Sequence, residues 1–359
     1  MRSVLVKRLS AKYRAYLIRK TAKQWRRQVA RKCPTKVGAK GRRGTKGRKT
    51  VRICAPEVFH LGQADTRYHV IDFLRRIERV LGAGNRVMLS FDKTRTLWPC
   101  GTLLFVAKLD ILLARYAGRI SCNYPIDPVV HELFEHIGVL RLLGNSSQVS
   151  VNADNVKDWY LVKGNDTDTS GFTQLFTQYQ SEMPFGVSQG LYEGMSEAVT
   201  NVVQHAYEGK LVPDSRKGWW VFAQQKDDRL VVVVCDLGIG IPKSLNRKFP
   251  ETVRASLVHR KRKDSWFLAL ALKEGRTRTE LLNRGKGLQD MLSFVKSADV
   301  GMFSIYSLAG SFIYGREGDV QRKYDFQIPV PGTIVQWSVP LTRFVCLEKP
   351  SGKGVAQQF

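Results

Sequence analysis

Cysteine is scarce in this chain of 359 residues, and long apolar runs are absent. Six scattered cysteines are too few for a disulfide scaffold, and because no Cys-x-x-Cys pair occurs, a zinc knuckle is excluded as well. No apolar run approaches the roughly 20 residues of a membrane helix; Val231–Cys235, for example, has only the length of a strand. A signal-peptide pattern is also missing. We therefore expect a cytoplasmic protein in a reducing setting, with no membrane partner.

Acidic residues are absent from the first 50 positions, where 19 Lys and Arg occur, and the first carboxylate is Glu57. Much of the formal net charge of +27 thus lies in a tail, residues 1–56. Ser3–Arg31 has the pattern of a basic amphipathic helix, whereas Gly38–Lys49 is low-complexity sequence that predicts disorder in the free chain. Dense positive charge attracts polyanions, so residues 1–50 favour a nucleic-acid partner. A solvated basic extension and an organelle-targeting presequence remain alternatives.

Several familiar site motifs are missing. No Gly-x4-Gly-Lys-Ser/Thr sequence occurs, so a Walker A loop is excluded. Gly82 and Gly84 lack the third glycine and the preceding strand of a dinucleotide fingerprint. His131 and His136 lie five residues apart, whereas a zincin needs a spacing of four on one helical face. We interpret both histidines as surface or core-edge residues of a helix.

The composition becomes globular after the tail, and 43% of all residues are hydrophobic. Residues 57–145 alternate between patterns typical of helices and of strands, which predicts a small α/β domain. The expected helices are 67–81, 101–116 and 127–137, and the expected strands are 86–91 and 119–122.

Residues 146–182 are predicted to be a linker, because 144–169 is rich in Asn, Asp, Ser and Gly. A second domain is expected over 183–345, followed by a C-terminal tail, 346–359. Its predicted helices are 188–207 and 288–297, and its predicted strands are 219–224, 230–235, 302–306, 312–314 and 333–339. A basic segment interrupted by proline, 242–284, separates the two halves of this domain.

The first candidate site motif lies on the helix predicted over 188–207. Glu197, Asn201 and His205 recur at a spacing of four, which places them on one face of an α-helix. A carboxylate can accept a proton from water, and an amide oxygen suits a hard cation such as Mg²⁺. Taken alone, such a stripe is more often an ordinary solvated helix face.

The second and third motifs contain paired glycines. Asp236-Leu-Gly238-Ile-Gly240 follows a strand of four valines; its glycines permit a sharp turn and a close approach to a flat ligand, and its carboxylate can accept from an exocyclic amine. Gly285-Lys286-Gly287-Leu288 opens a predicted helix, where free N–H groups and a lysine suit phosphate. Each motif by itself also fits an ordinary turn.

The order of these three motifs resembles the GHKL ATPase superfamily, which includes histidine kinases, gyrase B subunits and anti-sigma serine kinases. Pro331-Gly332-Thr333 resembles a further Gly-Thr element of that family. The resemblance covers about 183–342 and implies a Bergerat-type α/β sandwich, with helices on one face of a mixed sheet and ATP between helix and lid.

The resemblance also implies roles for individual residues. Asn201 would hold Mg²⁺, Glu197 would be the general base, and Asp236 would bind the adenine amine with Thr333 beside it. Residues 242–284 would form the ATP lid. The other residues expected to line the ATP site are His205, Gly238, Gly240, Gly285, Lys286, Gly287 and Leu288.

The first domain resembles a STAS domain of the anti-anti-sigma type, through Arg86–Asp92 and the sequence that leads into the helix at 101. That family has Asp-Ser-Ser-Gly at the helix start, and a serine there is phosphorylated. Here the positions hold Trp98-Pro99-Cys100-Gly101, so the acceptor hydroxyl is replaced by Cys100. Cys100 is either a thiol sensor near a helix N-terminus or, as we favour, a small buried residue.

Three functions follow from these patterns. The first is an Mg-dependent ATP-binding regulatory protein, hydrolysing ATP slowly and acting on a protein partner through its lid. The second is an anti-sigma-like serine/threonine kinase, and the third is a nucleic-acid binder that uses the basic arm. A histidine kinase is disfavoured, because no two-helix dimerisation segment with an acceptor histidine precedes the ATP domain.

Overall fold

The computed structural model describes residues 48–145, 159–179, 183–207, 217–226, 228–248, 263–273, 287–297, 301–315 and 320–341. The predicted helix at 3–31, the low-complexity stretch up to residue 47 and the tail 346–359 lie outside these ranges. Within them the chain is α/β, as predicted, and contains both parallel and antiparallel sheets.

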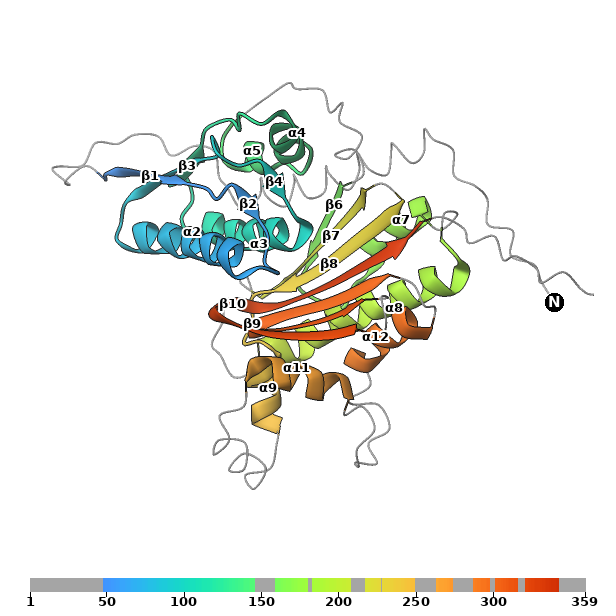
Figure 1. The fold of residues 1–359 in the computed structure, drawn as a ribbon. Coiled ribbons are helices and arrows are strands. Elements are labelled where there is room, and N and C mark those ends of the chain that lie inside the picture. Colours follow the sequence, from blue (N-terminus) through green and yellow to red (C-terminus); the bar gives the residue numbers. More distant parts are fainter. Residues whose placement is uncertain are drawn as a thin grey trace, which may run out of the picture.

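A three-stranded parallel sheet forms the N-terminal part, in the order β1-β3-β5. Its strands are β1 (Thr50–Cys54), β3 (Arg86–Ser90) and β5 (Ile120–Cys122). The helices α2 (Ala64–Gly82) and α3 (Pro99–Arg115) are the crossover connections, and both lie on the same side of the sheet (Figure 1). The predicted β-α-β-α series is thus confirmed. One boundary was wrong, because β1 lies inside the predicted tail, residues 1–56, and pairs with β3.

Short elements complete this N-terminal domain. Strands β2 (Val58–Phe59) and β4 (Thr96–Leu97) pair in parallel, and helices α4 (Pro128–His136) and α5 (Val139–Leu142) follow β5. The start of α4 is capped as its sequence predicts, since the Asp127 side chain accepts from the backbone N–H of Val130 at 3.1 Å. Phe134 of α4 joins the core, with its ring 4.9 Å from that of Phe91.

A five-stranded sheet in the order β6-β7-β8-β10-β9 forms the C-terminal domain. All four strand pairings are antiparallel, so the predicted mixed sheet was wrong. The strands are β6 (Trp159–Gly164), β7 (Trp219–Lys226), β8 (Arg229–Asp236), β9 (Met302–Gly315) and β10 (Val320–Pro340). The predicted linker, 146–182, was also wrong over 159–179, because β6 pairs along its whole length with β7.

Helices of the same domain cover one face of this sheet. They include α8 (Phe185–Asn201) and α12 (Gly287–Ser297), which pack against each other, and α7 (Ser170–Tyr179), which lies beside β6 and α8 (Figure 1). A single turn of π-helix, η1 (Val202–Ala206), extends α8. The segment predicted as a lid contains α9 (Ile241–Lys248) and α11 (Asp264–Lys273) among the described residues.

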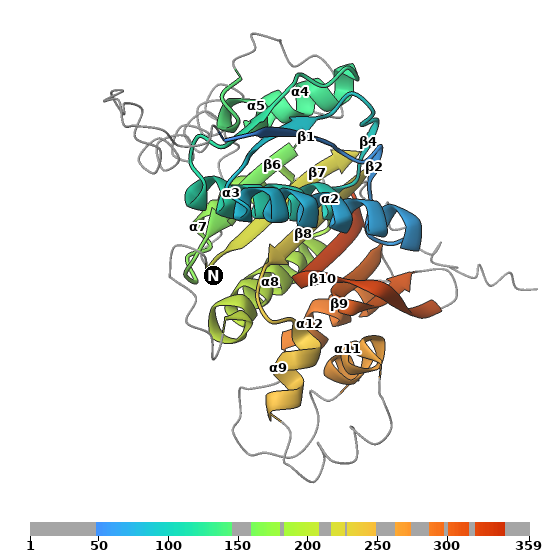
Figure 2. The ribbon, with the colours of Figure 1, turned by 90° about the vertical axis from the view of Figure 1, so that its left-hand side faces the viewer.

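Both faces of the large sheet are buried, and alternate residues of each strand point to different cores. Val232 and Val234 of β8 pack with α8 and α12, whereas Val233 and Cys235 pack with α2 and α3. The N-terminal helices therefore cover the face that the C-terminal helices leave open (Figure 2). Helices of the C-terminal domain thus lie on one face of this sheet, and α2 and α3 lie on the other (Figure 2). Among the described residues, the small sheet, helices α2 and α3, the large sheet and the helices of the C-terminal domain form successive layers (Figure 1).

Helix α3 lies in the middle of this arrangement and is apolar nearly all the way round. Its buried residues run without interruption from Pro99 to Ala107, as expected of a helix that is covered on both sides. Its two charged side chains in the central turns are paired: Lys108 with Glu78 at 2.7 Å, and Asp110 with Lys163 of β6 at 2.7 Å. Asp110 also accepts from the indole N–H of Trp220 at 3.3 Å, so polar contacts align the two domains.

No helix in the described ranges combines the length and the apolarity that a bilayer-spanning helix needs.

Gly101→Ala is expected to destabilise the protein, because a Cβ at position 101 would lie 2.4 Å from the carbonyl oxygen of Phe59. Overpacking of this kind costs about 1–3 kcal/mol, which urea unfolding would measure. Gly82→Ala is the matched control, since a Cβ there meets nothing within 4 Å. Equal urea midpoints for the two variants would contradict the packing of α3 against Phe59.

Candidate functional site

Three side chains from neighbouring strands form one row across the large sheet. Asp236 ends β8 and pairs with Thr333 of β10, which in turn pairs with Ser307 of β9. The Ser307 hydroxyl lies 3.0 Å from that of Thr333 and donates to the carbonyl of Gly332 at 3.1 Å. The register of the sheet therefore brings together the aspartate and the threonine that the sequence analysis singled out.

Asp236 is a buried carboxyl group, only 5% exposed. Burial raises its pKa to about 7, although hydrogen bonds from Gly238 and Thr333 act in the opposite direction. The Gly238 N–H donates to Asp236 Oδ1 at 2.7 Å. A carboxyl group with its pKa near neutrality can accept a hydrogen bond from an amine in its ionised form, and it can donate one when protonated.

The glycines after Asp236 are required by the fold. A Cβ at Gly238 would lie 2.1 Å from the carbonyl oxygen of Ala206, and that same oxygen accepts from the N–H of Ile239 at 2.8 Å. Gly238 was predicted to let a flat ligand approach closely. In the structure it allows the close approach of the η1 backbone at Ala206. Gly240 has φ +83°, a conformation that favours glycine, and it leads into α9, where Ile241 N–H donates to Ser307 Oγ at 3.0 Å.

Glu197 and Asn201 adjoin each other one turn apart on α8, as their spacing predicts. The Asn201 amide nitrogen donates to the Glu197 carbonyl at 3.0 Å and lies 3.2 Å from Glu197 Oε1. Because that nitrogen must face these acceptors, Oδ1 of Asn201 is directed elsewhere and has no hydrogen-bond donor among the described residues. An amide oxygen placed in this way is available to a cation.

His205 departs from the predicted α-helical stripe. Helix α8 ends at Asn201, and His205 belongs to the π-helical turn η1, so the α-helical spacing argument holds only for Glu197 and Asn201. Turns of π-helix occur frequently at functional sites. The side chain is half-buried and lies near enough to lower the pKa of Glu197 electrostatically.

The start of α12 meets Glu197. A Cβ at Gly287 would lie 1.7 Å from Glu197 Oε1, so this glycine is needed for close packing against the carboxylate. Leu288 packs at the edge of the core between the large sheet and the helices α8 and α12. Gly285 and Lys286 lie outside the described residues. The sequence predicts a phosphate at the N-terminus of α12. In the structure the Glu197 carboxylate lies against this end of the helix.

A cleft of about 330 Å³ between α8 and α12 leads to this position. Its lining is acidic, with Glu193, Glu197 and Asp290 among its residues. Burial raises the pKa of Glu197, and the nearby charge of Asp290 adds to the increase, while the Asn201 amide opposes it. No cluster of three or more His, Cys, Asp and Glu suited to a metal ion occurs in the described ranges. Carboxylates alone therefore do not make a metal site here. A cation would also need other oxygen ligands, such as Asn201 Oδ1 and oxygens of a bound molecule.

Sequence reasoning missed two residues that hold the site together. Tyr207 donates its hydroxyl hydrogen to the carbonyl of Gly218 at 2.7 Å and accepts from the N–H of Leu237 at 3.2 Å, which fixes the loop after β8 to the end of η1. Ser307 joins Gly332, Thr333 and Ile241. Neither residue belongs to a local motif, and only the strand register identifies Ser307.

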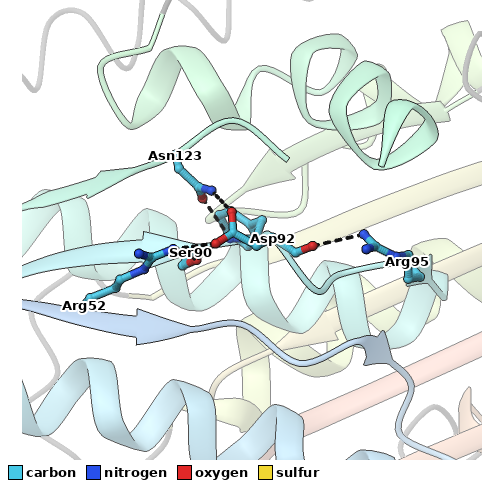
Figure 3. Close-up of polar contacts among 6 residues, drawn as sticks. Arg52, Ser90, Asp92, Arg95 and Asn123 are labelled. Atoms are coloured by element: carbon cyan, nitrogen blue, oxygen red, sulfur yellow. Dashed lines mark hydrogen bonds and ion pairs between the residues drawn. The ribbon is translucent and has the colours of Figure 1, made fainter. Parts of the chain in front are cut away.

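A separate polar cluster lies at the carboxyl edge of the small parallel sheet, a common place for ligands (Figure 3). Asp92 follows β3 and accepts from Ser90 at 2.8 Å, as well as from Asn123 and Arg52. These bonds, that of Ser90 first, lower the pKa of Asp92. The carboxylate is already bonded by Arg52 of β1, by Ser90 of β3 and by Asn123, which follows β5, so this cluster ties the three strands together and is not our candidate site.

Cys100 and the two histidines of α4 behave as structural residues. Cys100 is buried, and burial raises the pKa of its thiol to about 11, so the buried interpretation holds over a thiol sensor. His131 and His136 are half-buried at the core edge, as predicted, and His136 Nε2 lies 2.9 Å from the carbonyl oxygen of Trp159.

The stability contributed by protonated Asp236 should fall as pH rises from about 4 to about 7. Because burial raises the pKa of Asp236, the folded state holds this proton more tightly than the unfolded chain does. The penalty is absent below the unfolded pKa of about 3.9 and complete above the folded value, on the order of 4 kcal/mol. Urea unfolding across this range should show the fall in the wild type and much less of it in Asp236→Asn. Parallel pH profiles would rule out a raised pKa for this group.

Comparison of the sequence with protein-family models and with curated proteins finds no match to either. A proposal of function for this chain therefore rests on its own residues and fold.

Proposed function

We propose that the chain is an Mg-dependent ATP-binding regulatory protein of the GHKL class, with a Bergerat-type site in its C-terminal domain and a STAS-like N-terminal domain. The observation that carries the proposal is the row of Asp236, Thr333 and Ser307, with the loop after Asp236 closed on the helical turn that follows Asn201. Motifs that lie far apart in the sequence are thus neighbours in the fold.

The adenine end would be Asp236. Its carboxyl group is buried, and the three donors assigned to it leave it able to accept a further hydrogen bond from an exocyclic amine. Thr333 flanks it through the sheet register. In a low-dielectric position one such bond counts more than it would in water, which favours purine recognition by few groups.

The phosphate end would lie near Asn201. The acidic lining of the neighbouring cleft disfavours a bare polyphosphate but fits one that carries a divalent cation. Asn201 Oδ1 is the amide oxygen available to that cation, which when bound would neutralise phosphate charge. These donor types fit Mg²⁺ with ATP, and Gly287 and His205 lie close to Glu197, the neighbour of Asn201.

Glu197 is the proposed catalytic residue. Burial raises its pKa toward the working pH, which suits a general base that takes a proton from water. Its carboxylate contacts the Asn201 amide, so base and metal ligand would be held together. Slow hydrolysis would then change the segment 242–284, and through it the chain would act on a protein partner. The main alternative function is that of an anti-sigma-like kinase.

The basic residues 1–47 lie outside the described ranges. Nucleic-acid binding by this arm stays a prediction from the sequence.

Asn201→Ala should abolish Mg-dependent ATP binding, because it removes the only amide oxygen proposed for the metal. Calorimetric titration with ATP and MgCl₂ gives the dissociation constant, and a loss of more than about tenfold, or 1.4 kcal/mol, is expected. Gln204→Ala is the control, because it removes an exposed amide in the adjoining turn η1. Unchanged affinity in a folded Asn201→Ala protein would rule out the metal role.

Glu197→Gln should retain ATP and lose turnover, because the amide keeps the contact with Asn201 but cannot accept the proton. Release of labelled phosphate from γ-labelled ATP measures hydrolysis, with Asp290→Asn as a control for the neighbouring negative charge. Label transferred to a protein of a host lysate would favour the kinase alternative. Phosphate release at the wild-type rate from Glu197→Gln would exclude Glu197 as the base.

A further inference from the structure

Arg67 is a buried cation on α2, with no exposed surface. Its guanidinium donates through Nε to the carbonyl of Ile328 at 2.9 Å and through Nη2 to the carbonyl of Leu308. It also lies 4.2 Å from the centre of the Phe326 ring, while Nη1 has no hydrogen-bond partner among the described residues. Burial lowers its pKa to about 10. Its hydrogen-bond acceptors among the described residues are two backbone carbonyls, with no carboxylate among them.

These carbonyls belong to an irregular part of the large sheet. The pairing of β9 with β10 shifts register between Asp325 and Val330 and again between Val330 and Thr333. Opposite this irregularity, Leu308 has φ +51°, a conformation that costs energy in a residue with a side chain. We call residues 307–310 and 325–333 the β9–β10 bulge. Arg67 binds both of its strands, so it holds the bulge in shape.

The bulge touches the proposed nucleotide site. Leu308 packs against Gly240, where a Cβ would lie 2.9 Å from Leu308 Cγ, and the adjacent Ser307 accepts from the N–H of Ile241. Thr333, beside Asp236, is the last residue of the bulge.

The bulge also anchors α11 of the segment predicted as a lid. Asp325 Oδ1 accepts from the N–H of Ser265 at 3.0 Å, and Asp264 accepts from the N–H of Ala309 at 2.9 Å. One element therefore joins the N-terminal domain, the loop after Asp236 and α11.

We propose that Arg67 is a positioning residue through which the N-terminal domain sets the shape of the nucleotide site. The reason is that a buried guanidinium without a carboxylate is stabilised only while both carbonyls face it, which selects one arrangement of the bulge. The inference rests on the proposed function in one respect, the effect on ATP. The mechanical link from α2 to Gly240 and Ile241 is independent of any ligand.

The experiment compares Arg67→Met and Arg67→Lys with Asp110→Asn in the full-length chain. Asp110→Asn loses the charge pair with Lys163, a contact between the same two domains but away from the bulge. Hydrogen exchange of the ligand-free proteins is compared under conditions that give all of them the same global stability. Exchange at 238–241 and 307–310 should be faster than in the wild type in both Arg67 variants, but not in Asp110→Asn. Calorimetry with Mg-ATP should show at least a tenfold weaker affinity for Arg67→Met, a smaller loss for Arg67→Lys, and no more than a twofold change for Asp110→Asn.

Wild-type exchange at these positions in the Arg67 variants would overturn the inference, as would equal affinity losses in all three variants. If Arg67→Met does not fold, Arg67→Lys decides, because it keeps the charge and loses the paired donors. Absence of ATP binding to the wild-type chain would instead reject the proposed function. The exchange data would still test the link from α2 to the loop after Asp236, because they need no ligand.

Discussion

Helix α3 is buried between two β-sheets, and the remaining architecture follows from that burial. Its apolar surface continues nearly all the way round, so one sheet alone could not cover it. The small parallel sheet covers one side of α3. The other side is covered by the face of the large sheet that the C-terminal helices leave open. Each fully buried Leu or Phe in such a layer stabilises the fold by about 1.5–3 kcal/mol. The two domains therefore share a core, which includes residues of β8 and β10, the strands that carry Asp236 and Thr333.

The candidate site lies where this rigid part ends. Asp236, Thr333 and Ser307 are held by strand register, whereas Glu197 and Asn201 are held by helix spacing. The two groups are joined by hydrogen bonds from Ile239 to Ala206 and from Leu237 to Tyr207. Positions fixed by sheets and helices vary little, which suits a binding site.

Local patterns predicted much of the fold because they depend on neighbours in the sequence. The apolar spacing at 67–81 predicted α2, and Asp127 with Pro128 predicted the start of α4. Long-range pairing was not predictable in this way. Residues 159–164 lie in a polar surrounding that favours a loop, and only pairing with β7 makes them a strand. The sheet was expected to be mixed, but all its pairings are antiparallel, since strand direction depends on how distant segments meet.

The sequence by itself determined which residue types are available for chemistry: a carboxylate and an amide one helical turn apart, an aspartate after a buried strand, and paired glycines. It also determined that Val231–Cys235 would be a strand, because an apolar run of that length fits a buried strand. Only the tertiary structure decided that Thr333 and Ser307 lie beside Asp236, that Gly238 faces Ala206, and that Arg67 of the N-terminal domain contacts Leu308 and Ile328. The physical reason is that local periodicity sets which face of an element is apolar, whereas contacts between elements arise only when those faces are buried against one another.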